Sequence, residues 1–181
     1  VEKNNTANDA ARSSVVPNQI GTKSSKIKHV IYVVRENRTF DQELGSNGRG
    51  NGDPTLNLFG EESAPNTRAL ARQFVTFDNF YADAEVSANG WNWVSQANSN
   101  PWSEEMWPSN YSGRGAPYPS EHNDPEARAK EHDAYFWEHL SKNNISFRNY
   151  GFYTQRDKNG KAHAADKEVL DPNTDHDYIG W

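Results

Sequence analysis

The sequence predicts an α/β domain in which helices cover a mainly parallel β-sheet. A continuous run of β-branched and aromatic residues occupies positions 30–34, and shorter strand-like runs occupy 75–77 and 145–150. Helix-like stretches separate these runs, which is the order typical of layered α/β domains. A run that is apolar on both faces is typical of a strand buried in a parallel sheet. The chain supplies about three such strands, whereas complete sheets usually have about five or six.

Composition narrows the class of protein. The chain has 181 residues with a formal net charge of −6, and only 34% of them are hydrophobic. This apolar fraction is low for a self-sufficient core, but the 12% of aromatic residues argues against wholesale disorder. The acidic balance without a basic stripe argues against a nucleic-acid partner. No apolar stretch approaches the roughly 20 residues that span a bilayer, so no transmembrane segment is expected.

The chain is expected to begin with a linker and continue as one domain. Residues 1–25 are rich in Asn, Ser and Ala without periodicity, which predicts a linker or disordered tail. Residues 26–181 then form the domain portion. The absence of cysteine excludes disulfides, thiolate metal sites and thiol nucleophiles.

Turn signals and helix signals alternate along this portion. The glycine-rich segment 45–54 contains two Asn-Gly pairs, which predicts a surface loop. A helix is expected at 65–73, with Ser63 as its cap, Pro65 in its first turn, and Thr67, Leu70, Ala71 and Phe74 on one face.

Further along the chain, a helix is expected at 88–97 and a proline-rich loop at 100–125. From Pro125 the helical pattern returns and ends at Asn143 and Asn144. Residues 154–178 are polar, and we expect them to form a loop.

Polar side chains follow the first two predicted strands. Glu36 and Asn37 come directly after the run 30–34, and Ser87 follows the second strand at a predicted helix start. Ligands gather at the carboxyl ends of strands in open α/β sheets. Carboxylate and amide oxygens suit Mg²⁺, Ca²⁺, Mn²⁺ or Zn²⁺, and a serine at a helix N-terminus can attack phosphorus. On spacing alone, a solvated turn explains Glu36 and Asn37 better than a metal site does, and an ordinary helix cap explains Ser87 better than a nucleophile does.

Other groups have simpler interpretations. The six histidines never pair at the spacing of a zinc-binding helix. An acidic, metal-tolerant cluster near the end of the sequence is expected to be solvated; it contains Asp171, Asp175, His176 and Asp177. The Trp-rich stretch 91–107 could stack on sugars or nucleobases, although aromatic cover over the sheet explains it better.

Several motifs resemble the bacterial phosphoesterase family, which contains phospholipases C and an acid phosphatase and belongs to the alkaline phosphatase superfamily. The segment KHVIYVVRENRTFDQ at 28–42, followed by Leu-Gly at 44–45, is similar to the opening signature of that family. FDNFYADAEVSANG at 77–90, WPSNY at 107–111 and RNYG at 148–151 continue the similarity. The resemblance covers roughly residues 26–181.

The resemblance implies a metal-dependent phosphoester hydrolase with a three-layer αβα, alkaline-phosphatase-like fold. It implies Glu36 and Asn37 as ligands of a divalent ion (Ca, Mn, Mg or Zn), Ser87 as the nucleophile and Asn92 as a contact of the phosphate. Close look-alikes tend to have His where this chain has Trp91. The resemblance also implies a secreted or periplasmic location, as is common in that family.

The domain of that family is considerably longer than this chain, and its later half carries an acidic metal-binding motif. We therefore expect residues 26–181 to be the N-terminal portion of a truncated domain. A missing C-terminal half or a partner chain would complete it. The alternative is a non-catalytic binding or structural module with Trp-rich surface loops.

Overall fold

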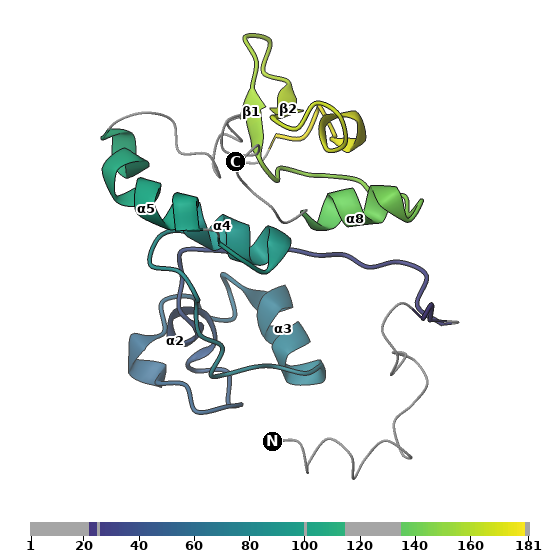
Figure 1. The fold of residues 1–181 in the computed structure, drawn as a ribbon. Helices are drawn as coiled ribbons and strands as arrows, with labels where there is room; N and C mark the ends of the chain where they lie inside the picture. The colour runs from purple at the N-terminus through teal and green to yellow at the C-terminus, as the bar shows by residue number, and fades with distance from the viewer. Residues whose placement is uncertain (1–21, 25, 100, 115–134, 180–181) are drawn as a thin grey trace, which may run out of the picture. The chain divides into compact units, whose positions relative to one another are not determined.

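The computed structural model describes residues 22–24, 26–99, 101–114 and 135–179 (Figure 1). Nearly all of the predicted tail at 1–25, and most of the helix predicted from Pro125, lie outside these residues. The chain divides into two compact units, called here unit 1 (Val1–Asn79) and unit 2 (Phe80–Trp181). Within the described ranges, no helix is both long enough and apolar enough to cross a membrane.

The described residues of unit 1 form two short helices and a 3₁₀ turn. Helix α2 (Phe40–Leu44) packs against η1 (Pro54–Leu56) and α3 (Pro65–Gln73). A reciprocal cap starts α2, because Gln42 N–H donates to Thr39 Oγ1 over 3.3 Å and Thr39 N–H donates to Gln42 Oε1 over 3.1 Å. The predicted loop then leads to η1, and Asp53 caps η1 through Thr55 N–H.

Helix α3 confirms the helix predicted at 65–73, with Pro65 as its first residue. The predicted cap is wrong, because Ala64 occupies the N-cap position without a side-chain hydrogen bond. The predicted apolar face is only partly buried: Ala71 is buried as expected, but Leu70 is 57% exposed, and the charged Arg68 is buried. Helix α3 therefore packs in unit 1 through the charged side chain of Arg68, which donates hydrogen bonds to several acceptors.

The strongest predicted strand is not formed in this structure. Residues 30–34 and 75–77 belong to no helix or strand, and Val30 and Ile31 are 83% and 87% exposed. Residues 145–150 contribute only a single bridge, between Asn149 and Thr174. A strand needs a neighbouring strand to take up its backbone hydrogen bonds, and the described residues pair only β1 with β2. The three-layer αβα fold therefore stays a prediction.

Replacing Ile31 by Thr tests the exposure of this run. We expect the free energy of unfolding of the 181-residue chain to change by no more than about 0.5 kcal/mol, because the side chain lies in water. Urea unfolding followed by circular dichroism measures this change. A loss of about 2 kcal/mol or more would instead indicate burial in a sheet.

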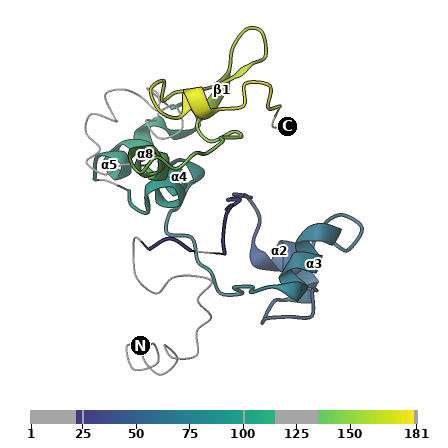
Figure 2. The ribbon, with the colours of Figure 1, turned by 90° about the vertical axis from the view of Figure 1, so that its right-hand side faces the viewer.

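The described residues of unit 2 include the helices α4, α5 and α8 (Figure 2) and a β-hairpin. Helix α4 (Ser87–Gln96) confirms the helix predicted at 88–97, and α8 (Phe136–Lys142) ends at Asn143 as predicted. Helix α5 (Pro101–Asn110) and η2 (Tyr111–Gly113) lie where a loop was predicted, so that prediction is wrong for 101–113. Pro101 is the first residue of α5, where proline suits a helix.

The hairpin pairs β1 (Thr154–Arg156) with β2 (Ala162–Ala164) in antiparallel register. The prediction of a loop over 154–178 is therefore wrong, since η3 (Asp171–Asn173) follows in the same segment. The connection carries an Asn159-Gly160 pair, and Gly160 has a φ of 78°. Asp157 Oδ1 accepts hydrogen bonds from Asn159 N–H (2.8 Å) and Lys161 N–H (2.9 Å), which holds the turn.

Aromatic side chains form the core of unit 2. The buried members of this core are Tyr135, Trp137, Tyr153, Ala164 and Leu170. Partly buried aromatic rings from α4, α8 and the segment before β1 pack against them. These contacts explain how a chain with so few aliphatic residues still buries a hydrophobic cluster.

Candidate functional site

Glu36 and Asn37 lie side by side in unit 1, and both are exposed. Asn37 has a φ of 64°, in the left-handed region that Asn tolerates better than most residues. Asn37 Nδ2 donates to Glu36 Oε1 over 3.5 Å. The two predicted metal ligands therefore already share one small surface, and a half-turn of the amide would present its oxygen beside the carboxylate.

Arg35 holds this pair to the helices of unit 1. Its guanidinium donates to Thr67 Oγ1 over 2.7 Å, and it forms an ion pair with Glu43 at 3.1 Å between Nη1 and Oε2. Thr67 lies on α3 and Glu43 on α2. Because the residue next to Glu36 is fixed to both helices, the position of Glu36 relative to them is restricted.

Ser87 is the first residue of α4 and is half-buried. Within the part of the chain that the structure describes, its hydroxyl makes no hydrogen bond. Asn89 Oδ1 accepts the Val86 N–H over 3.3 Å, and the Asn89 amide donates to Glu104 over 3.2 Å. Asn89, not Ser87, therefore caps the helix, which leaves the serine hydroxyl available.

Glu36 and Asn37 belong to unit 1, whereas Ser87 and Asn92 belong to unit 2. The assembly of these four residues into one site is therefore a prediction.

Asn92 lies inside unit 2. It is 0% exposed, on the face of α4 that also buries Asn89 and Ser95. Ser95 Oγ lies 3.0 Å from Tyr153 Oη, and this hydrogen bond attaches the polar face to the aromatic core. In this structure Asn92 belongs to a buried polar helix face, and its contact with a phosphate stays a prediction.

Trp91 packs against the aromatic core of unit 2. Its ring contacts Phe152 edge-on with centroids 5.1 Å apart, and Tyr153 at 6.0 Å. Most of the Trp-rich stretch 91–107 forms α4 and α5 and does not form loops. Trp91 therefore acts as aromatic cover, and its ring is not presented as a platform for stacking a sugar or a base.

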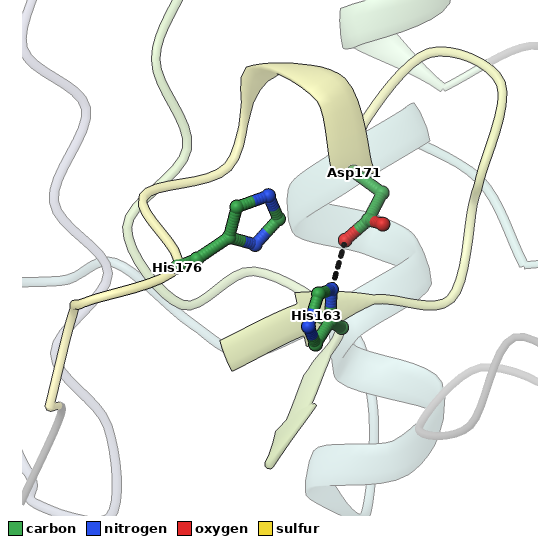
Figure 3. Close-up of side chains that lie close together, drawn as sticks. All are labelled: His163, Asp171 and His176. Carbon is green, nitrogen blue, oxygen red and sulfur yellow. Dashed lines mark ion pairs between the residues drawn. The ribbon is translucent and has the colours of Figure 1, made fainter. Parts of the chain in front are cut away.

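The structure also brings together His163, Asp171 and His176, and each of them offers one potential metal ligand atom within 4.8 Å of the others (Figure 3). His163 lies on β2, Asp171 begins η3, and His176 follows η3. His163 Nδ1 is 3.5 Å from Asp171 Oδ1, and the two imidazole rings have centroids 4.5 Å apart. Sequence reasoning placed Asp171 and His176 in one cluster but missed His163, which the hairpin supplies.

The Asp171 carboxylate is more enclosed than His163, with 16% of its side chain exposed against 37%. Burial acts to raise the pKa of Asp171, but the hydrogen bond from Ala164 N–H and the ammonium of Lys167 outweigh it, so the pKa lies below its usual value. Ala164 N–H donates to Oδ1 over 2.6 Å, and Lys167 Nζ lies 3.3 Å from Oδ2. The carboxylate is therefore ionised at neutral pH.

Comparisons of the chain with models of known protein families, with curated proteins and with solved structures find no match. The phosphoesterase resemblance is thus carried by the motifs in the sequence. The fold and the activity that it implies stay predictions.

Proposed function

We propose that this chain is part of a metal-dependent hydrolase of phosphoester bonds that uses Ser87 as its nucleophile. The observation that carries the proposal is the pair Glu36–Asn37, exposed and adjacent at 3.5 Å, within the motif at 28–42 that resembles the phosphoesterase signature. The position of Ser87 at the start of α4 supports it, because backbone N–H groups at a helix N-terminus favour an anionic phosphate.

The donor set suits the ion that the resemblance implies. One carboxylate oxygen and one amide oxygen are hard ligands, which Mg²⁺, Ca²⁺ and Mn²⁺ prefer and Zn²⁺ accepts. Such ions take about four to eight ligands, so Glu36 and Asn37 have to be joined by further donors, from water, the substrate or another segment. When bound, the ion would polarise the phosphoryl oxygens and lower the pKa of a nearby hydroxyl.

The residues of the chain would carry out the attack on phosphorus, the binding of the phosphoryl oxygens and the positioning of Glu36. Ser87 Oγ would attack phosphorus, give up its proton to solvent or a nearby base, and form a phosphoseryl ester as the alcohol leaves. The first turn of α4 would bind the phosphoryl oxygens through its backbone N–H groups. Arg35 would keep Glu36 in place through Thr67 and Glu43.

The test uses the natural protein together with any segments that adjoin residues 1–181. We expect Mn²⁺- or Ca²⁺-dependent hydrolysis of p-nitrophenyl phosphate or of a phosphocholine ester, and we expect Ser87→Ala to lower kcat at least about a hundredfold because the nucleophile is removed. Mass spectrometry of the quenched reaction should find phosphate on Ser87. Comparing the monoester with the diester bis(p-nitrophenyl) phosphate defines the substrate class.

Matched controls separate chemistry from folding. Ser141→Ala removes an exposed serine from α8 and should leave kcat unchanged. Glu36→Gln should raise the metal concentration needed for half-maximal activity, whereas Glu62→Gln, at another exposed glutamate of unit 1, should not. Full activity in Ser87→Ala, or no cleavage of any of these esters, would refute the proposal.

A further inference from the structure

We propose that His163, Asp171 and His176 form a second metal site, which binds a divalent transition-metal ion such as Zn²⁺ and fastens the β1–β2 hairpin to the turn that follows it. The site lies entirely in unit 2 and shares no residue with the pair Glu36–Asn37. It does not depend on the proposed hydrolase activity. Its role is structural, because it joins residues that are 13 positions apart in the sequence.

The distances fit one ion with little movement. Zn²⁺ binds imidazole nitrogen and carboxylate oxygen at about 2.0–2.2 Å, so two ligands of a tetrahedral ion lie roughly 3.3 Å apart. His163 Nδ1 and Asp171 Oδ1 are already 3.5 Å apart, and all three ligand atoms lie within 4.8 Å of one another. The side chain of His163 is 37% exposed, so an ion can reach it and the ring can turn. Figure 3 shows the three side chains pointing toward a common space.

Neighbouring acceptors orient the two imidazoles of the cluster. His176 Nδ1 lies 2.7 Å from the Ala162 carbonyl oxygen, which can only accept, so Nδ1 carries the proton and Nε2 keeps its lone pair. His163 lies between two carboxylates, with Nδ1 3.5 Å from Asp171 Oδ1 and Nε2 3.8 Å from Asp157 Oδ2, so an ion that takes the place of a proton at Nδ1 would leave the Nε2–H facing Asp157. Metal-binding histidines in proteins are usually oriented by partners of this kind.

The donor set selects the class of ion. Two imidazole nitrogens and one carboxylate oxygen suit Zn²⁺ and the neighbouring first-row ions, whereas Mg²⁺ and Ca²⁺ prefer oxygen alone. Three protein ligands leave a position that water can fill. Lys167 opposes binding, because its ammonium lies 3.3 Å from Asp171 Oδ2.

The experiment is a calorimetric titration of the 181-residue chain with Zn²⁺, repeated with Co²⁺ and followed by visible absorption. We expect one saturable transition-metal site with a Co²⁺ spectrum typical of mixed nitrogen and oxygen ligands. His163→Gln and His176→Gln should each weaken binding by more than about tenfold, because the loss even of outer partners weakens metal sites by about 10–100-fold. Lys167→Gln should strengthen binding severalfold, because it removes the opposing charge.

Three control variants fix the location. His139→Gln removes an exposed histidine from α8, Asp177→Asn removes a carboxylate close in sequence to His176, and Glu36→Gln removes the ligand proposed for the other metal. All three should bind Zn²⁺ at this site as the natural sequence does. Equal losses in these controls and in the histidine variants would overturn the proposal, and so would a titration without a saturable site.

A measurement on the unaltered chain avoids variants that fail to fold. Zn²⁺ should slow amide hydrogen exchange in residues 162–176, because the ion holds β2 and the η3 segment together. Exchange in α3 of unit 1 should stay unchanged and serves as the reference. Unchanged exchange in 162–176 at saturating Zn²⁺ would contradict the proposal.

Discussion

Replacing Arg68 by Met is expected to lower the free energy of unfolding of unit 1 by about 3 kcal/mol or more. Only 6% of the Arg68 side chain is exposed. Its guanidinium donates to Glu43 O (2.8 Å), Ser46 Oγ (3.0 Å), Asn57 Oδ1 (3.3 Å), Phe59 O (3.3 Å) and Glu61 Oε2 (3.2 Å). Methionine fills a similar volume but leaves these acceptors without their donor. The hydrogen bonds that join α3 to α2 and to the loop between them are then lost.

Arg72 provides the matched control for Arg68. It lies one turn along α3 and binds the same carboxylate, with Nη2 2.6 Å from Glu61 Oε1, but 40% of its side chain is exposed. Arg72→Met should therefore cost no more than about 1–2 kcal/mol, counting its hydrogen bond to Asn47. Arg68→Lys keeps the charge without the planar fork of donors, and we expect a loss between these two values.

The six Trp residues of the chain all lie in unit 2, so tryptophan fluorescence does not report on unit 1. Amide hydrogen exchange in α2 and α3, followed by mass spectrometry in increasing urea, measures the stability of unit 1 directly. An Arg68→Met variant whose α3 amides exchange as slowly as those of the natural sequence would show that Arg68 does not organise unit 1.

Replacing Trp137 by Ala is expected to destabilise unit 2 by about 3–5 kcal/mol. The Trp137 side chain is almost fully buried and stacks on Tyr135, with ring centroids 4.4 Å apart. Its edge contacts with Phe136 (5.3 Å) and Tyr153 (5.4 Å) join α8 to the segment that enters β1. Alanine leaves a cavity at the centre of this cluster, and a cavity adds to the lost transfer free energy.

Trp137 also supplies a hydrogen bond to a buried carboxylate. Its indole N–H donates to Asp166 Oδ2 over 3.0 Å, while Asp166 Oδ1 accepts the backbone N–H groups of Glu168 and Val169. Trp137→Phe keeps much of the ring contact but removes this donor, so we expect a loss of about 1–3 kcal/mol. A Phe variant as stable as the natural sequence would show that the hydrogen bond adds nothing.

Urea unfolding followed by near-ultraviolet circular dichroism measures these changes, because the signal comes from packed aromatic rings. The control is Tyr150→Ala, at an aromatic residue of unit 2 that is 56% exposed and whose ring meets that of Tyr178 edge-on with centroids 5.9 Å apart. This variant should cost less than about 1 kcal/mol. A Trp137→Ala loss no larger than that of Tyr150→Ala would contradict the assigned core.

Local signals predicted α3, α4 and the end of α8, but not α2 or α5. Pro65 begins α3, and Asn143 and Asn144 end α8, because proline and asparagine act on their own backbone and need no distant partner. The Asn159-Gly160 pair is an equally local signal for a hairpin. The polar residues around it led to the prediction of a loop instead.

The strands could not be predicted in the same way. The run 30–34 has strong β propensity, but a strand exists only where another segment accepts its hydrogen bonds, and its residues lie exposed here. The buried face of α4 was also missed, since Asn89, Asn92 and Ser95 are polar and their burial depends on α5 and Tyr153. Burial of polar groups depends on partners that are distant in sequence.

The sequence by itself determined the positions of α3 and α4, the adjacency of Glu36 and Asn37, and the place of Ser87 at a helix start, because these depend on neighbouring residues. Only the tertiary structure decided that Arg68 replaces an apolar face of α3, that Trp91 belongs to a core, and that His163 joins Asp171 and His176. Each of these outcomes requires the chain to fold back on itself. The residue types limit which contacts are chemically possible, and the tertiary structure determines which of these contacts form.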